Sequence, residues 1–115
     1  MRSCTFLVVD DSLITIRKLS QLLEDLGHRV VGTATGGAEA VERYREIRPD
    51  LVTMDITLPD LSGIEAVKGI MAEDPEALVV MVTSHGQEQM VIDSIDAGAK
   101  GYVMKPVKAD ILQET

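Results

Sequence analysis

Short apolar runs alternate with stretches of helical periodicity along the whole chain of 115 residues. The runs are rich in Val, Leu and Met, and they span residues 6–9, 30–34, 51–54, 78–82 and 102–104. Continuous apolar runs of this length are typical of strands that are buried on both faces of a parallel sheet. The order of segments therefore predicts an α/β domain.

Between the runs, apolar residues recur every three or four positions, as on the buried face of a helix. The first such stretch, residues 13–26, stops at Gly27, a common helix-ending residue. Three further helices are predicted around residues 41–47, 64–71 and 91–95, with Pro49, Pro75 and Gly98 as their stops. Ser62 and Glu65 have the spacing of a capping box. A fifth helix is predicted from Lys108, and its shortness suggests a chain cut from a longer protein.

Composition excludes several classes of function. The chain has 11 Lys and Arg against 19 Asp and Glu, and only three aromatic residues, which argues against nucleic-acid binding by this chain. No apolar run approaches the roughly 20 residues of a membrane helix, and we see no export leader. A single cysteine, Cys4, fits a reducing cytoplasm. We therefore expect one cytoplasmic domain over residues 1–115.

Polar residues follow the predicted strands. Asp10 and Asp11 end the first and Asp55 ends the third; Thr83 with Ser84 and Lys105 end the last two. All strand ends of a parallel sheet meet at one edge, and ligands bind there where the strand order reverses. In the doubly wound order 2-1-3-4-5 the first and third strands are neighbours, about 4.8 Å apart. The three carboxylates are then expected to share one pocket.

Three carboxylates in one pocket repel one another unless one is protonated or cations hold them together. Lys105 supplies one positive charge, and all-oxygen ligation suits Mg²⁺ as a second cation. A carboxylate can also attack phosphorus and become an acyl phosphate. Phosphoryl transfer needs charge neutralisation above all, which Mg²⁺, the Lys105 ammonium and the Thr83 hydroxyl would provide.

The chain resembles the receiver domains of two-component response regulators. The matching motifs are Val8-Val9-Asp10-Asp11-Ser12, Met54-Asp55-Ile56-Thr57-Leu58-Pro59 with Gly63, Val82-Thr83-Ser84, and Lys105-Pro106. They cover the chain from about Thr5 to its end, and 54–59 and 89–100 are most similar to chemotaxis-type single-domain regulators. The resemblance implies the flavodoxin-like (βα)5 fold with the strand order given above.

The resemblance also implies a role for each motif residue. Asp55 corresponds to the phosphoacceptor, and Asp11, Asp55 and the Thr57 backbone carbonyl to the Mg²⁺ ligands. Asp10 corresponds to the acid that holds a metal-bound water, and Lys105 to the partner of the phosphoryl group. Thr83 and Tyr102 correspond to the hydroxyl and the aromatic ring of the switch. Thr57 and His85 occupy positions that vary in the family, and the role of His85 stays open.

Plainer interpretations exist for these residues. Asp10 and Asp11 are also residue types that favour the start of a helix. Taken alone, Lys105 indicates a lysine exposed to solvent. Tyr102 alone indicates packing rather than switching. Met90 and Ile92 are either scattered surface residues or a docking patch. The common strand edge and the motif spacing favour the receiver interpretation.

The expected function is a phosphorylation-dependent switch rather than a turnover enzyme. A sensor histidine kinase would phosphorylate Asp55, and the face made by the fourth helix, fifth strand and fifth helix would then change its affinity for a target protein or output domain. Chemotaxis is one candidate pathway, and a module of a larger regulator is the alternative. A haloacid-dehalogenase-type phosphatase would need a second Asp at position 57, which is Thr, and an FMN carrier would need a phosphate-binding first loop instead of two aspartates.

Overall fold

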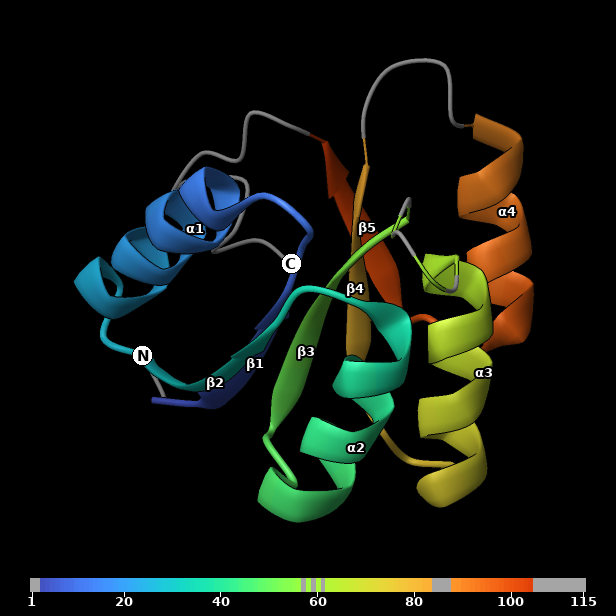
Figure 1. The fold of residues 1–115 in the computed structure, drawn as a ribbon, viewed down its shortest axis with the longest axis horizontal. Coiled ribbons are helices and arrows are strands. Elements are labelled where there is room, and N and C mark those ends of the chain that lie inside the picture. Colours follow the sequence, from blue (N-terminus) through green and yellow to red (C-terminus); the bar gives the residue numbers. More distant parts are fainter. Residues whose placement is uncertain (1–2, 57, 59, 61, 84–87, 105–115) are drawn as a thin grey trace.

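The computed structural model describes residues 3–56, 58, 60, 62–83 and 88–104. Its five strands are β1 (Thr5–Val9), β2 (Arg29–Ala34), β3 (Leu51–Asp55), β4 (Val79–Thr83) and β5 (Gly101–Met104). Its four helices are α1 (Leu13–Asp25), α2 (Gly37–Ile47), α3 (Gly63–Glu73) and α4 (Glu88–Ala97). Strands and helices alternate as predicted (Figure 1). The fifth helix predicted from Lys108 lies outside the described residues.

The five strands form one sheet in the order β2-β1-β3-β4-β5, and every neighbouring pair is parallel. This confirms the predicted doubly wound architecture. The chain moves outward from β1 to β2 and then returns past β1 to β3, so the strand order reverses between β1 and β3. Val9 pairs with Met54 at the end of this contact, which brings the carboxyl ends of the two strands side by side.

Two hydrophobic clusters sandwich the sheet. Helix α1 covers one face through Ile16, Leu19 and Leu23, while α2, α3 and α4 cover the other (Figure 1). The inner strand β4 is buried throughout, but the edge strands β2 and β5 are partly exposed because each has a neighbour on one side only. Burial on both faces was therefore a correct expectation for the inner strands and wrong for the edges.

The helix ends follow the predicted signals. Ser62 caps α3, since its hydroxyl accepts a hydrogen bond from the Glu65 N–H at 3.2 Å. Gly27 and Gly98 follow α1 and α4 with positive φ values of 93° and 126°, a conformation that costs glycine little.

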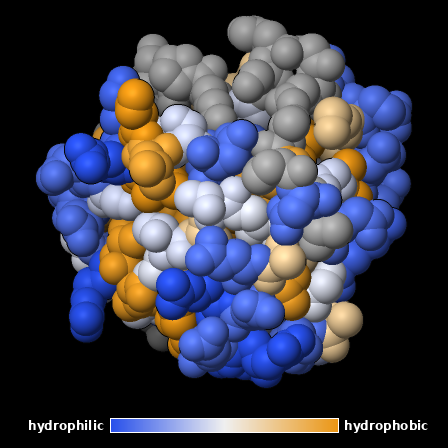
Figure 2. All heavy atoms as spheres, in the orientation of Figure 1, coloured by the Kyte–Doolittle hydropathy of each residue, from blue (hydrophilic) through white to orange (hydrophobic). Residues whose placement is uncertain are grey.

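Among the described residues, no helix combines the length and apolar character needed to cross a bilayer. Hydrophilic side chains cover the outward side of α2 (Figure 2).

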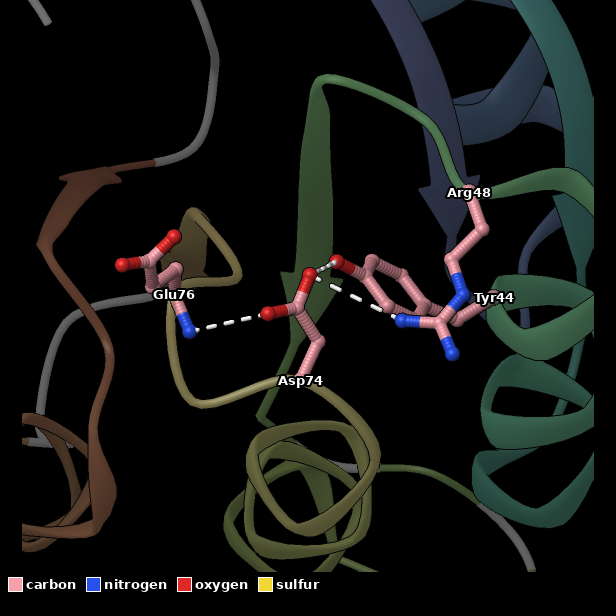
Figure 3. Close-up of polar contacts among 4 residues, drawn as sticks. All are labelled: Tyr44, Arg48, Asp74 and Glu76. Carbon is pink, nitrogen blue, oxygen red and sulfur yellow. Dashed lines mark hydrogen bonds and ion pairs between the residues drawn. The ribbon is translucent and has the colours of Figure 1, made fainter.

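The carboxyl-terminal ends of α2 and α3 are joined by a polar cluster around Asp74 (Figure 3). The Tyr44 hydroxyl donates to Asp74 Oδ2 at 2.9 Å, and Arg48 Nη1 lies 3.7 Å from the same oxygen. The Glu76 N–H donates to Asp74 Oδ1 at 3.0 Å. The Glu76 N–H and then the Tyr44 hydroxyl hold the pKa of Asp74 below its ordinary value, because both stabilise the charged carboxylate.

Replacing Asp74 with Asn is expected to destabilise the protein at neutral pH, with a smaller difference in acid. The folded pKa of Asp74 is lowered, so its stabilisation is present above the ordinary value of 3.8 and is lost as pH falls through the folded pKa. Urea unfolding midpoints of wild type and D74N between about pH 7 and pH 3 measure this. Asp96→Asn on α4 is the matched control. A difference that stays constant with pH would contradict the prediction.

Candidate phosphorylation site at the switch point

Three carboxylates converge where the strand order reverses. Asp10 and Asp11 directly follow β1, and Asp55 is the last residue of β3. One carboxylate oxygen from each of them lies within 4.8 Å of the other two. Asp10 and Asp55 are only 2% and 6% exposed, whereas Asp11 is exposed. The structure therefore brings together the three acidic residues that the strand ends predicted, with one side of the group open to solvent.

Backbone hydrogen bonds hold Asp10 in place from both sides. Its N–H donates to the Ala34 carbonyl at the end of β2, at 3.1 Å. Its Oδ1 accepts from the Ser12 N–H at 2.9 Å, and Ser12 is also the N-cap of α1. The plainer interpretation of Asp10, that it helps to start a helix, is thus compatible with a role in the site. The start of α1 fixes the orientation of the buried Asp10 carboxylate.

The backbone after Asp55 returns closely past the end of β3. The Gly63 N–H donates to the Ile56 carbonyl at 2.6 Å. A Cβ atom on Gly63 would run into the Asp55 carbonyl oxygen, which is backbone and has no freedom to move aside. The glycine at this position of the motif is therefore required by the close approach of α3 to the end of β3.

The acidic cluster has the donor atoms and spacing of a site that could hold a cation. At an effective dielectric constant of about 20, two unit charges about 5 Å apart repel by about 3 kcal/mol. Three ionised carboxylates within 4.8 Å of one another thus favour either a shared proton or a bound cation. The donors are hard oxygen atoms with an open side for water, which fits Mg²⁺ better than Zn²⁺.

Thr83 lies on β4, the strand that pairs with the Asp55 strand β3. It is the last residue of β4, is 2% exposed, and follows Val82, which pairs with Asp55 across the sheet. On the other side it pairs with Met104 of β5. Thr83 and Tyr102 both line a groove of about 310 Å³ between α4 and β5. Thr83 is thus the lining residue that adjoins the partner of Asp55 in the sheet, and Tyr102 lines the groove at the surface, where it is half exposed.

The residues of α4 that are exposed beside this groove are only in part the ones that the sequence predicted. The apolar spacing that predicted this helix, Val91 and Ile95, placed both residues on its buried face, but Ile95 is 45% exposed and lines the groove together with Ile92. Met90 packs against the hydrophobic core instead of standing on the surface. Only Ser94 of α4 is fully buried, so this helix contacts the sheet through a narrow stripe. The apolar patch on α4 is therefore made by Ile92 and Ile95 rather than by Met90 and Ile92.

Four predicted positions, Thr57, Ser84, His85 and Lys105, lie outside the described residues. Their roles stay predictions. One interaction near the site was not predicted: Asp60, five residues after Asp55, accepts hydrogen bonds from the backbone at the start of α2. The sequence carried a weak signal for it, since α2 starts at Gly36-Gly37 without a capping side chain of its own.

The chain is a doubly wound domain, a class that binds its ligands at the switch point, and here an acidic cluster lies there. Comparison with known proteins gives the family. Residues 6–115 match the response regulator receiver domain. The chemotaxis protein CheY of Thermotoga maritima is 47% identical over 100 residues, which cover 87% of this chain and 83% of that protein. The chain belongs to the response-regulator receiver family.

Solved structures agree with this assignment. The CheX–CheY–BeF3–Mg complex of Borrelia burgdorferi contains a chain that matches with a TM-score of 0.90 and 37% identity, over 96% of this chain and 84% of that one. NtrX of Brucella abortus matches with a TM-score of 0.91 and 32% identity, over 98% of this chain but 25% of NtrX. This chain is thus homologous both to CheY and to receiver domains of larger regulators.

Replacing Gly63 with Ala is expected to destabilise the protein by about 1–3 kcal/mol, the usual cost of overpacking. The Cβ atom of the new alanine would meet the backbone of Asp55, which cannot move aside. Urea unfolding measures the loss. Gly32→Ala is the matched control, since its Cβ would meet the movable Cδ1 end of Ile47. Equal losses in the two variants would show that the contact with the Asp55 backbone is not what requires glycine.

Proposed function

We propose that this chain acts as one receiver domain, a switch turned on by phosphorylation of Asp55. The observation that carries the proposal is the convergence of Asp10, Asp11 and Asp55 at the switch point of a receiver-family domain. Of the three, Asp55 is the last residue of the central strand β3 and is buried beside β4. A covalent change there adjoins both the acidic pocket and the strand that carries Thr83.

Mg²⁺ is the cofactor that fits this pocket. Asp11 and Asp55 would hold it through their side chains and Thr57 through its backbone carbonyl, with Asp10 acting through a water molecule. When bound, Mg²⁺ offsets the carboxylate charges and those of the incoming phosphoryl oxygens. The hydrogen bond from the Ser12 N–H keeps Asp10 oriented for this role, and the exposed Asp11 leaves a solvent-facing side for the phosphodonor.

The transfer itself makes one bond and breaks another. A carboxylate oxygen of Asp55 attacks the phosphorus of a phosphohistidine in line with the leaving nitrogen. The new O–P bond forms an acyl phosphate while the P–N bond breaks, and the electron pair of that bond stays on the ring nitrogen. The donor leaves as neutral imidazole, because the proton on its other ring nitrogen is already present in the phosphohistidine. The Lys105 ammonium and the Thr83 hydroxyl stabilise the charged phosphoryl oxygens.

The phosphoryl group then biases the domain between two states. Its added negative charge, roughly −1.5 to −2 by analogy with other phosphorylated side chains, attracts the Thr83 hydroxyl. Thr83 and Tyr102 line the same groove, so a shift of Thr83 gives the Tyr102 ring room to turn inward. The surface around Ile92 and Ile95 changes with it, which alters the affinity of the face formed with the fifth helix for a target.

The partners that fit this scheme are a sensor histidine kinase and a target protein or output domain, with the chain located in the cytoplasm. Similarity to CheY supports a chemotaxis pathway, while similarity to NtrX supports a module of a larger regulator. The only reactions of the chain itself would be its phosphorylation and the later hydrolysis of its acyl phosphate, so no turnover substrate is required.

Incubation with acetyl phosphate and Mg²⁺ is expected to add the mass of one phosphoryl group to the wild-type protein. Asp55→Asn removes the nucleophile, so this variant is expected to gain no mass. Chelating Mg²⁺ should stop the reaction as well. Intact-protein mass spectrometry measures all three samples, and Asp93→Asn on α4 is the control that should react like wild type. An equal gain in the Asp55 variant would contradict the proposal.

The ring of Tyr102 is expected to become less accessible when Mg²⁺ and beryllofluoride are bound. In a Tyr44→Phe background it is the only tyrosine, and the chain has no tryptophan, so acrylamide quenching of intrinsic fluorescence reports on it alone. Quenching should fall on activation. In a Thr83→Ala version of the same background this fall should disappear, because nothing is drawn toward the phosphoryl analogue. Equal responses in the two proteins would rule out the Thr83–Tyr102 coupling.

A further inference from the structure

Helix α2 is capped by a residue from elsewhere in the chain. Gly36 occupies its N-cap position and offers no side-chain hydrogen bond. The carboxylate of Asp60 takes this role: Oδ1 accepts from the Gly37 N–H at 2.8 Å, and Oδ2 accepts from the Ala38 N–H at 3.1 Å. Within the helix itself these two N–H groups have no acceptor, because they belong to its first turn. The positive end of the helix dipole also favours a carboxylate at this position. Asp60 therefore links the segment after β3 to α2.

The start of α2 is shaped to receive this carboxylate. A Cβ atom on Gly36 would lie 2.9 Å from Asp60 Oδ1, so any side chain there would compete with Asp60 for space. Glu39 in the first turn accepts from the Thr35 N–H at 3.0 Å and is thus already engaged. Since Gly36 has φ −148° and ψ 164°, its backbone is open to any residue, and the space for Asp60 is the structural reason for glycine.

The capping contact extends a row of hydrogen bonds between segments that adjoin the acidic pocket. The Asp10 N–H donates to the Ala34 carbonyl just before α2, and Asp60 binds the first residues of α2. The Gly63 N–H closes back onto the Ile56 carbonyl directly after Asp55. The segment after β1 is thus bonded to the end of β2, and Asp60 bonds the segment after β3 to the start of α2.

We propose that Asp60 is a positioning residue for metal binding and phosphorylation at Asp55. By anchoring the backbone downstream of Asp55 to the start of α2, it holds the acidic pocket in the geometry that a cation requires. The inference rests on the proposed function, because it assumes that the pocket takes up Mg²⁺. Asp60 itself does not belong to the acidic cluster of Asp10, Asp11 and Asp55.

The obvious alternative is that Asp60 only stabilises α2, as any capping residue does. The double variant Gly36→Asp with Asp60→Ala separates the two roles. It moves the carboxylate to the helix's own N-cap position, where Asp is a preferred residue, and it leaves the net charge unchanged. The removal of the Asp60 carboxylate also frees the space that a Cβ at position 36 needs. The helix keeps a cap, but its link to the segment after β3 is lost.

The test compares wild type, Asp60→Ala and the double variant by two measurements. Urea unfolding reports stability, and isothermal titration with MgCl2 reports the dissociation constant for Mg²⁺. Asp60→Ala is expected to be less stable and to bind Mg²⁺ about tenfold more weakly, the lower end of the loss seen when supporting contacts around a metal site are removed. The double variant is expected to recover stability but not Mg²⁺ affinity.

Each other outcome has a definite meaning. Recovery of both stability and Mg²⁺ affinity in the double variant would overturn the inference and leave Asp60 as a cap alone. Wild-type affinity in Asp60→Ala would also overturn it. If Asp60→Ala does not fold, the double variant alone decides by its affinity. A wild-type protein that binds no Mg²⁺ would instead refute the proposed function, so the two failures are distinguishable.

Discussion

Repulsion between three carboxylates is the constraint on which the site depends. The chain places one carboxylate oxygen each of Asp10, Asp11 and Asp55 within 4.8 Å of one another and buries two of these residues, so the backbone must hold them together against their repulsion. That restraint comes from the first turn of α1, from the end of β2 and from the tight return of the chain at Gly63. The repulsion lowers the stability of the fold at this site, and the packing of the two hydrophobic clusters offsets that loss.

The link from this pocket to the surface runs along the sheet rather than through a helix. Asp55 pairs with Val82, and the next residue of β4 is Thr83, which pairs with Met104 of β5. Two steps across neighbouring strands thus connect Asp55 with the groove that Tyr102 lines. A short path of this kind suits the proposed switch, in which a phosphoryl group on Asp55 would favour one arrangement of Thr83 over another.

The sequence was most informative where a residue's role depends on its own strand. Apolar runs and helix stops located the elements, and strand ends located Asp10, Asp55 and Thr83, because the edge of a parallel sheet collects them. The strand order and the individual roles came from the family resemblance. Ile95 was misplaced because helical periodicity cannot show how narrow a stripe of α4 is covered. Asp60 was missed because its partners are 22 and 23 residues away: the start of α2 lacks a capping side chain, but no local pattern shows which distant residue supplies the cap.

Helix α2 is attached to the α3 region at both of its ends. Asp60 binds its first residues, and Tyr44 and Arg45 bind Asp74 and Glu73 near its last turn. The two helices also approach closely at Gly69, where a Cβ would lie 2.9 Å from Val41. Helix α4 has a single fully buried residue and no comparable set of attachments among the described residues. The attachments of the helices are therefore uneven: side-chain bonds join α2 to the α3 region at both ends, and α4 has fewer such bonds among the described residues. For the switch proposed above, this places the side most free to change shape at α4, next to the groove lined by Thr83 and Tyr102.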